Sequence, residues 1–345
     1  MPSPATERQQ PRGERIVPGL WRLRLPLPWS GIPHCNAWVV DAPDGDGHLL
    51  FDCGLHTDRS FDQLVDALHQ IGKRIEDTRL LICTHAHVDH YGQAKTVIDA
   101  AGCELWMHSN HAHMTDSLGD PERLLEQRVA IGRESGVPEE LLQHYREAGS
   151  ATIREGVSGL VEPARELVEG VEVPSAVGTW RAIETPGHAP SHVSLYQPER
   201  RLLIAGDHIL GRVALYYDYG WTDDPVADYL DSLAKIDALG ARLCLPGHGK
   251  SFTDVQGHVE AHREAVLGRL DRVEDVVRAS GPATAIDMIP EIYGRPLSKE
   301  NAGWLISETM CYLRHLERRA VVQRSDDDAH PHWTATGRRA TPTGG

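Results

Sequence analysis

Seven residues in the first third of the chain carry the strongest signal in its sequence: Thr84-His85-Ala86-His87-Val88-Asp89-His90. They follow an apolar run, residues 79–83, that predicts a buried strand, and they precede a segment that can open a helix. His85 and His87 should point the same way, because alternate residues of an extended segment share a face. The two residues that end the stretch come after the chain has begun to turn, so they can face a second ion. Imidazole and carboxylate groups without a thiolate favour a catalytic zinc-type centre over a closed structural site.

Length and composition indicate an ordinary globular protein with one large domain and a smaller one. The chain has 345 residues, of which 40% are hydrophobic and 25% charged. Its formal net charge of −15 argues against broad affinity for nucleic acid or anionic membranes, since both require a basic surface. No apolar run approaches the roughly 18 residues that span a bilayer, and the N-terminus has no secretory h-region. Six dispersed cysteines without a Cys-x-x-Cys pair predict a reducing, cytoplasmic location.

Changes in composition divide the chain into predicted units. A polar leader, residues 1–13, precedes a catalytic domain at 14–255, in which residues 109–163 form a helical insertion. This insertion is predicted either to cover the site as a lid or only to add packing. Residues 256–336 predict three helices and a hairpin, the pattern of a winged helix, and residues 337–345 a disordered tail.

Periodicity and turn signals place the expected elements along the catalytic domain. Strands are predicted at 21–25, 35–40, 48–52, 79–83, 103–108, 166–168, 178–184, 192–197, 201–205 and 243–246. Helices are predicted at 60–71 and 93–101, and within the insertion from Pro121, from Pro138 and over 152–160. An Asp-Gly turn at residues 44–47 predicts a hairpin between the second and third strands.

Three further candidate ligands follow predicted strands in loops marked by glycine or proline. They are His188 in Thr185-Pro186-Gly187-His188, Asp207 in Gly206-Asp207-His208, and His248 in Pro246-Gly247-His248-Gly249. Such loops present reactive groups from a rigid sheet, so these side chains are candidates for the same site as the opening stretch.

The ordered set His85-x-His87-x-Asp89-His90, His188, Asp207 and His248 resembles the metallo-β-lactamase fold superfamily in its dinuclear hydrolase branch, over residues 16 to about 255. The resemblance implies an α/β fold, an αββα sandwich with the site along one edge. It implies that His85, His87 and His188 hold one metal ion. Asp89, His90 and His248 would hold the other, and Asp207 would bridge the two.

A branch within the superfamily is more similar still. The segments 206–211, 228–233 and 246–249, with the winged-helix-like tail, are similar to the β-lactamase-like protein 2 branch. That branch includes endoribonucleases and hydroxyacylglutathione-hydrolase-like proteins. Asp207 stands where many true β-lactamases of the superfamily have a zinc-binding cysteine, so β-lactam hydrolysis is not expected as the native role. The insertion at 109–163 does not belong to the compact members of the branch.

The implied chemistry is hydrolysis by a hydroxide between two divalent ions about 3.5–4 Å apart. Zn²⁺ is the expected metal, although iron or manganese suits the same ligands. Asp207 is assigned as bridging ligand, and Asp89 as the ligand that also orients the nucleophile, so both are catalytic candidates. Asp52, at a strand end, is a candidate acceptor for the N–H of a ligand imidazole, with a turn cap as the alternative.

Other polar residues receive weaker assignments. Arg212 and Tyr217 lie in a loop after Asp207 that can face substrate, although its tyrosine cluster can equally be packing. His192 and His208 are expected to line the pocket or support the ligands. The pair His111 and His113 is expected to be exposed at the start of the insertion.

Three functions compete. The first is hydrolysis of a thioester or related acyl ester, a small-molecule substrate that suits an acidic chain. The second is a metal-dependent phosphodiesterase or endoribonuclease, which the branch and the winged helix allow but the charge disfavours. The third is a winged-helix regulator that senses a ligand. The C-terminal unit has basic residues that could touch phosphates, but it is interpreted as a packing or homodimer module; those residues are Arg314, Arg318, Arg319 and Arg324.

Overall fold

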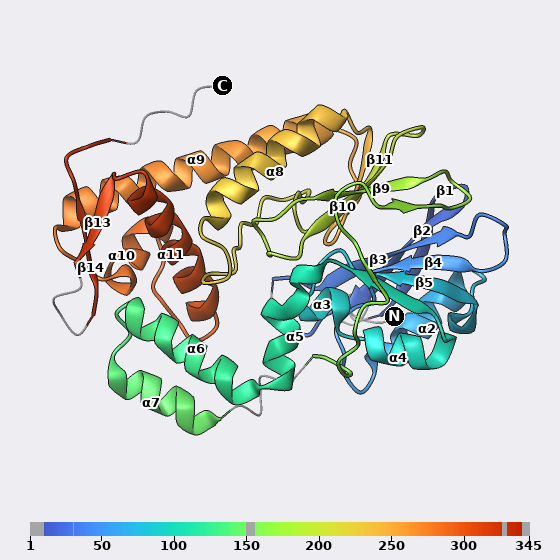
Figure 1. The fold of residues 1–345 in the computed structure, drawn as a ribbon, viewed down its shortest axis with the longest axis horizontal. Helices are drawn as coiled ribbons and strands as arrows, with labels where there is room; N and C mark the ends of the chain where they lie inside the picture. The colour runs from blue at the N-terminus through green and yellow to red at the C-terminus, as the bar shows by residue number, and fades with distance from the viewer. Residues whose placement is uncertain (1–9, 30, 150–155, 326–329, 340–345) are drawn as a thin grey trace, which may run out of the picture.

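The structure, a computed structural model, describes residues 10–29, 31–149, 156–325 and 330–339. Two β-sheets pack face to face with helices on their outer faces, and a helical region follows at the C-terminal side (Figure 1). The architecture is the predicted αββα sandwich. Along the described residues, no helix is long and apolar enough to cross a membrane.

The first sheet contains seven strands within the described residues and has the order β1-β2-β3-β4-β5-β6-β7. Its first four strands form an antiparallel meander, and the strands from β4 onward are parallel. The strands are β1 Arg12–Val17, β2 Leu20–Pro26, β3 His34–Asp41, β4 His48–Phe51, β5 Thr78–Ile82, β6 Glu104–Met107 and β7 Arg165–Glu166.

The second sheet has the order β12-β11-β10-β9-β8. Only β11 and β12 are parallel in it, and the other neighbours are antiparallel. The strands are β8 Glu172–Val173, β9 Trp180–Glu184, β10 Val193–Gln197, β11 Leu202–Gly206 and β12 Leu243–Pro246.

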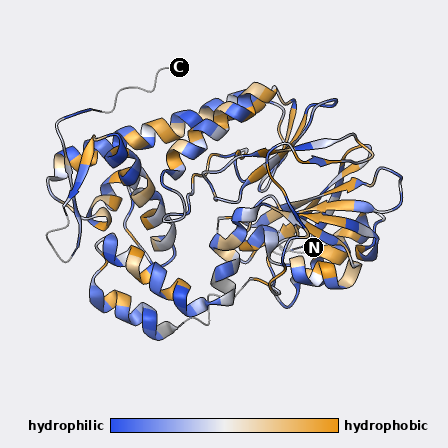
Figure 2. Ribbon diagram, viewed as in Figure 1, coloured by the Kyte–Doolittle hydropathy of each residue, from blue (hydrophilic) through white to orange (hydrophobic). Residues whose placement is uncertain are grey.

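Alternation along the strands explains the layers. In β3, Trp38 and Val40 face the core between the sheets, whereas Ala37 and Val39 face the outer helices. This follows from the period of two in a strand, and Figure 2 shows both sheets rich in hydrophobic residues. The helices on that outer face are α2 Ser60–Gln70 and α4 Ala94–Ala101, with the short η1 Ile75–Asp77 and α3 Val88–Tyr91 beside them.

The C-terminal helices share a core with the second sheet. Leu203 and Ala205 of β11 point away from the inter-sheet core and pack in one hydrophobic cluster with Leu233 of α8 and Met310 of α11. The elements around this cluster are α8 Pro225–Leu239, α9 Val255–Ser280, α10 Ala285–Tyr293, α11 Ala302–Arg318, β13 Val322–Ser325 and β14 His332–Ala335. Three helices and a hairpin therefore follow residue 254 in the predicted order, and they continue the core of the sandwich.

The helical insertion packs against the C-terminal region. Its elements are η2 Ser109–His111, α5 Ala112–Gly119, α6 Pro121–Glu134 and α7 Glu139–Ala148. At the end of α6, Glu134 accepts hydrogen bonds from the Tyr219 hydroxyl at 2.9 Å and from Arg324 Nη1 at 2.6 Å. Ile286 N donates to Ser135 O at 3.0 Å. These contacts join α6 and the residue after it to α10 and β13. The insertion therefore lies beside the C-terminal helices, as Figure 1 shows.

Several predictions about elements need correction. The third helix of the insertion, predicted at 152–160, lies outside the described residues up to 155 and is not helical from 156 to 160. The leader predicted at 1–13 lies largely outside the described residues, and β1 already begins at Arg12. This strand was not predicted, because its polar residues reflect a half-exposed edge that pairs only with β2. Helix α8 was also missed, although Asp224 caps it and Pro225 begins it.

Glu308 of α11 is a buried acid in the C-terminal core, and it generates a prediction about stability. Burial raises its pKa to about 7, although Arg269 Nε lies 3.7 Å from its carboxylate and opposes the rise. The folded-state pKa is thus above the ordinary value of 4.5. The protonated group therefore stabilises the fold fully below about pH 4.5, and this contribution is lost as the pH rises through about 7.

Glu308→Gln stays neutral, so its free energy of unfolding should not fall over this interval on account of residue 308. The difference in the free energy of unfolding between Glu308→Gln and the wild type should therefore shift in favour of the variant by on the order of 2 kcal/mol from pH 5 to pH 8. Denaturant unfolding at both pH values measures this difference. Glu317→Gln, a change of a more exposed residue on the same helix, serves as control. Parallel pH dependence in the wild type and Glu308→Gln would contradict the prediction.

Candidate metal centre

Five loops meet at one edge of the sandwich. They follow β4, β5, β9, β11 and β12, and the parallel pairs β4–β5 and β11–β12 bring their ends to the same edge. Because β10 runs antiparallel to β9 and β11, the loop between β9 and β10 lies at that edge too. All seven predicted ligands belong to these loops or to α3 directly after β5, so the topology gathers residues that are up to 163 positions apart, from His85 to His248.

The first group of donors is His85, His87 and His188. Each offers a ring nitrogen within 4.8 Å of the others. His87 Nδ1 lies 3.0 Å from His188 Nε2, and the His85 ring centre lies 4.6 Å from that of His87. His85 is fully buried, His188 is 7% exposed, and His87 is partly exposed.

The second group is Asp89, His90 and His248, again with donor atoms within 4.8 Å of one another. Asp89 Oδ2 lies 3.3 Å from His248 Nε2 and 3.7 Å from His90 Nε2. Asp207 stands between the two groups. Its carboxylate oxygens lie 3.0 Å from His248 Nε2, 3.5 Å from His90 Nε2 and 3.8 Å from His188 Nε2. This is the position that a bridging ligand requires.

The donor atoms fit a pair of divalent ions. Three buried atoms that point into this cluster form no hydrogen bond with any described residue: His85 Nε2, His90 Nε2 and Asp207 Oδ1. Buried polar atoms normally have a hydrogen-bond partner, so three such atoms without one in the same place indicate a site for a cation. Gly247 leaves room for them, because a Cβ there would overlap Asp207 Oδ1 and press on the His90 ring. The clusters are thus consistent with a dinuclear site, while the metal's identity and each residue's role as ligand stay predictions.

Charge in the cluster supports the same interpretation. Burial lowers the pKa of His188 to about 4 and that of His85 well below its usual range, so both rings are neutral and can donate a lone pair. Burial also raises the pKa of Asp207, but His248 and His90 outweigh it and hold that pKa well below its usual range. Burial lowers the pKa of His248 and of His90, but Asp207 and Asp89 outweigh it and raise the first to about 10 and the second well above its usual range. Positive charge is therefore held beside the carboxylate, and a bound cation can take its place.

Asp52 lies where the sequence predicted it, directly after β4. Its Oδ2 accepts from His90 Nδ1 at 2.8 Å and from the Thr84 hydroxyl at 3.0 Å, and its Oδ1 accepts from Thr84 N at 2.8 Å. A carboxylate beyond a ligand imidazole fixes the ring and its tautomer, so His90 is left with Nε2 facing the cluster. Asp52 adopts a φ of 59°, a strained value for a residue with a side chain.

His248 is held in a comparable way from the first sheet. Its Nδ1 donates to His34 O at 2.9 Å, which leaves Nε2 toward Asp207. The loop that carries it is fastened by Asn36 Nδ2, which donates to Pro246 O at 2.7 Å, and by Arg22 Nη2, which donates to Gly249 O at 2.6 Å. Two buried side chains of β2 and β3 therefore place a ligand that is more than 200 residues away.

The prediction that Tyr217 contacts substrate is wrong. Tyr217 is fully buried in the C-terminal core, with its ring 5.6 Å from those of Tyr229 and Tyr312. The neighbouring Tyr216 faces the site instead, with its ring 5.7 Å from His87 and 5.6 Å from His188. Adjacent residues of this extended loop point to opposite sides, and sequence could not tell which side faced the metal centre. Arg212 is exposed, so its assignment stays a prediction.

His113 also needs correction, because it is 3% exposed and not a surface residue. It lies 3.3 Å from Asp218, a site residue that sequence reasoning missed and that contacts His87 Nε2 at 2.8 Å. The His-x-His spacing at 111–113 was its only signal. His192 supports Asp207, whose backbone N–H donates to His192 Nε2 at 3.0 Å. His208 is buried behind it, with the two rings 6.0 Å apart.

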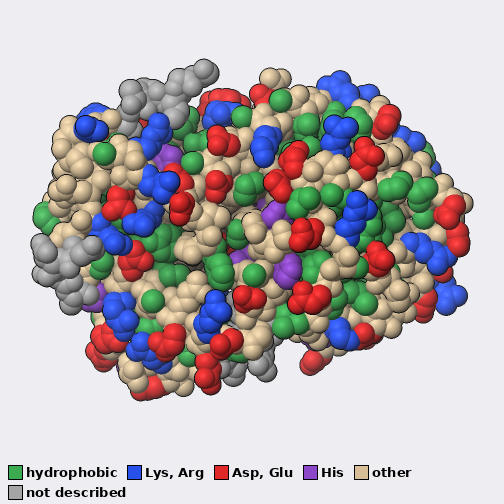
Figure 3. Space-filling model, in the orientation of Figure 1, with side chains coloured by type: hydrophobic (Ala, Val, Ile, Leu, Met, Phe, Trp, Pro, Cys, Tyr) green, Lys and Arg blue, Asp and Glu red, His purple; other side chains and the backbone are tan. Residues whose placement is uncertain are grey.

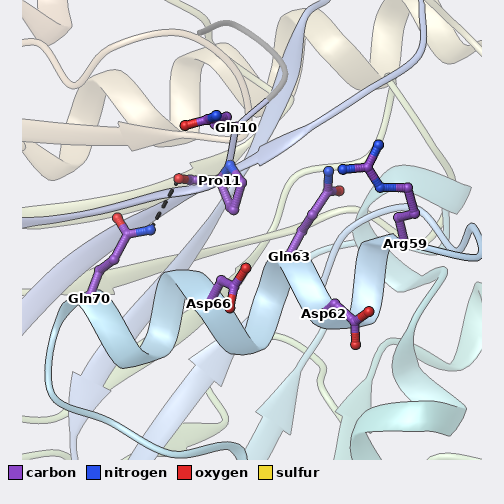
Figure 4. Close-up of a pocket in the computed structure, with 7 residues that line it drawn as sticks. All are labelled: Gln10, Pro11, Arg59, Asp62, Gln63, Asp66 and Gln70. Atoms are coloured by element: carbon purple, nitrogen blue, oxygen red, sulfur yellow. Dashed lines mark hydrogen bonds between the residues drawn. The ribbon is translucent and has the colours of Figure 1, made fainter. Parts of the chain in front are cut away.

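The surface agrees with this placement. Figure 3 shows histidine side chains reaching the surface near the centre of the face, with acidic side chains around them. A separate polar pocket lies on the outer face of α2, where Gln70 Nε2 donates to Pro11 O at 3.2 Å (Figure 4). No histidine lines that pocket, so it is not part of the candidate metal centre.

Metal content tests the centre directly. The wild type should bind two divalent ions per chain after dialysis against Zn²⁺ and then against buffer. His248→Ala should retain about one ion, since the first group stays intact, and Asp207→Ala should weaken both sites because the shared carboxylate is gone. His111→Ala, whose ring contacts Thr115 outside the centre, is the control. Wild-type stoichiometry in both ligand variants would refute the assignment.

Comparison with known proteins places the chain in a family. Residues 31–248 match the sequence profile described as the Metallo-beta-lactamase superfamily. The chain is 26% identical over 314 residues to the probable metallo-hydrolase YqjP of Bacillus subtilis, a match that covers 87% of this chain and 92% of that protein. A crystal structure of a metallo-beta-lactamase family protein from Thermus thermophilus superposes with a TM-score of 0.79 at 25% identity, over 93% of this chain and 100% of that one.

Two further matches cover a smaller share of the chain. The chain is 32% identical over 133 residues to the beta-lactamase-like protein 2 homolog of Caenorhabditis elegans, across 39% of this chain and 43% of that protein. It is 31% identical over 147 residues to the atrochrysone carboxyl ACP thioesterase of Aspergillus fumigatus, across 39% of this chain and 44% of that protein. Because the superfamily profile covers more than half of the chain, the protein belongs to the metallo-β-lactamase superfamily.

Proposed function

We propose that the protein is a dinuclear metal-dependent hydrolase that acts on thioesters or related acyl esters. The observation that carries the hydrolase proposal is Asp207, a carboxylate that is only 10% exposed and lies within 4 Å of ring nitrogens from both donor groups. A carboxylate in that position can hold two ions at once. Two bound divalent ions supply a water of lowered pKa and polarise the oxygen of the bond to be cleaved.

The residues around the ions have distinct tasks. Asp89 lies in the second group, with its Oδ2 3.3 Å from His248 Nε2. We assign its carboxylate the task of accepting a hydrogen bond from the attacking water and so orienting it. Asp52 and the backbone at His34 hold the far nitrogens of His90 and His248. The ligand rings therefore need little rearrangement when substrate arrives.

The acyl specificity has three supports. The net charge of −15 suits a small acyl substrate better than a polyanion. A distant relative is named as a thioesterase, which acts on an acyl group carried by a protein. The wall of the site is aromatic, since Tyr216 stacks edge-on against His87 and His188, and the Trp221 ring lies 6.1 Å from that of His113. An apolar wall suits an acyl chain.

A metal-dependent phosphodiesterase or endoribonuclease is the second candidate. The similarity to a beta-lactamase-like protein 2 homolog and the helical C-terminal region favour it. Three of the four basic residues that would bind phosphate lie beside acidic side chains, however. Arg318 lies 3.6 Å from Asp223, Arg324 lies 2.6 Å from Glu134, and Arg314 pairs with a glutamate one turn away. Paired arginines offer a weaker attraction to a polyphosphate chain, which ranks this candidate second.

A panel of substrates tests the proposal on the Zn²⁺-loaded full chain. Acyl-CoA and acyl-glutathione thioesters, a lactone, a β-lactam, bis-p-nitrophenyl phosphate and single-stranded RNA should be compared under one set of conditions. Turnover is expected for a thioester, abolished by a chelator and restored by added Zn²⁺. Asp89→Asn should lower kcat by at least about 100-fold while keeping the fold, because the water loses its orienting carboxylate.

The outcomes separate the candidates. Chelator-sensitive turnover of the phosphodiester or of RNA alone would replace the acyl proposal with the second candidate. Turnover of the β-lactam alone would reject the argument made from Asp207. Activity that survives complete removal of metal would reject the hydrolase mechanism itself.

A further inference from the structure

His87 has two ring nitrogens, and both have a defined neighbour. Its Nδ1 faces the first donor group, 3.0 Å from His188 Nε2. Its Nε2 lies 2.8 Å from Oδ2 of Asp218, in the loop between β11 and α8. Asp218 is not one of the seven predicted ligands, and its side chain is only 12% exposed. The contact therefore needs an explanation outside the predicted ligand set.

Asp218 is held in place from two other directions. The Tyr216 hydroxyl donates to its Oδ1 at 2.9 Å, and His113 Nδ1 lies 3.3 Å from its Oδ2. Tyr216 belongs to the same loop, whereas His113 belongs to α5 at the start of the helical insertion. A carboxylate that is contacted by three groups keeps one orientation, which a mobile surface aspartate would not do.

The network continues beyond His113. Its Nε2 lies 2.8 Å from the Ser191 hydroxyl, and that oxygen also accepts the backbone N–H of Ala86 at 3.1 Å. Ala86 stands between His85 and His87, and Ser191 lies three residues after His188. A chain of contacts thus joins the two segments that supply the first donor group to the loop after β11 and to the insertion.

Donors and acceptors in this chain are compatible with one assignment. The ionised Asp218 carboxylate can only accept, so the proton of neutral His87 is on Nε2 and the lone pair on Nδ1 faces the first donor group. His113 presents Nδ1 to Asp218 Oδ2 in an ion-pair contact of 3.3 Å, and its Nε2 can accept from the Ser191 hydroxyl. Asp218 Oδ2 and the Ser191 oxygen each serve two partners on this path, and each contact is compatible with the donor and acceptor capacity of its atoms. The path selects the tautomer of His87 that can bind a metal ion.

We propose that Asp218 is the positioning residue for His87 and that the helical insertion, through His113, takes part in metal binding at the first donor group. The insertion then does more than add packing, because it helps to hold the ligand His87 in position. This inference rests on the metal centre of the proposed function, but it does not depend on which substrate is cleaved.

The experiment measures Zn²⁺ affinity of the full chain by competition with a chromophoric chelator, without substrate. In Asp218→Asn, one ion should bind about 10–100-fold more weakly, the usual effect of removing such a carboxylate, and the other should keep its wild-type affinity. Asp224→Asn is the matched control. Asp224 is similarly buried, at 15% exposure, and contacts a histidine, His315, at 2.9 Å, but lies outside the donor groups. It should leave both affinities unchanged.

Two further variants test the path itself. His113→Gln should weaken the same ion by a smaller factor, and Asp218→Asn/His113→Gln should be no weaker than Asp218→Asn alone, because His113 acts through Asp218. Tyr216→Phe, which keeps the ring and removes one donor to Asp218, should show a small loss at the same ion. Thermal unfolding of each metal-free variant separates a local effect from a failure to fold.

Several results would overturn the inference. Wild-type affinity for both ions in Asp218→Asn would show that His87 needs no such support. Equal loss of both ions would indicate general damage, and a third Zn²⁺ that Asp218→Asn removes would make Asp218 a ligand. A selective loss of one ion in a protein that hydrolyses no thioester would support the inference while rejecting the acyl substrate, so the two proposals can fail separately.

Discussion

The largely enclosed carboxylate of Asp207 is the constraint on which the rest of the site depends. It lies within 4 Å of imidazoles from three different loops, and burial by itself would favour its neutral form. Its negative charge persists only because positive charge is close by, supplied by protonated imidazoles or by metal ions. The need to place that carboxylate and its neighbours at one point explains why two sheets must end at the same edge.

Three of the ligand imidazoles are held by a hydrogen-bonding partner at the ring nitrogen that points away from the metal centre. Asp52 holds His90, the His34 carbonyl holds His248, and Asp218 holds His87. These partners come from the residue directly after β4, from β3 and from the loop after β11, so the site is supported by both sheets. Free rotation of an imidazole would cost metal affinity, and fixing the ring in advance removes that cost.

The insertion and the C-terminal helices form one continuous support on the side of the second sheet. The core around Leu203 extends through α8 to α11, and Glu134 at the end of α6 binds both Tyr219 and Arg324. Tyr217 and Tyr216 show the consequence within one loop, because the first is buried in that core and the second faces the metal centre. The position of this loop, and so of Asp218, therefore depends on the C-terminal helices.

Sequence alone determined the sandwich and most of the donor set. His85, His87, Asp89 and His90 share a short strand-to-helix turn, and local geometry suffices to bring such neighbours together. The loops of His188, Asp207 and His248 were recognisable because glycine or proline marks each strand end. Only the tertiary structure decided that His113 is buried, that Tyr216 and not Tyr217 faces the site, and that Asp218 contacts His87. Those facts depend on how the insertion and the C-terminal helices pack against one loop, and contacts between such distant segments leave no periodic pattern in the sequence.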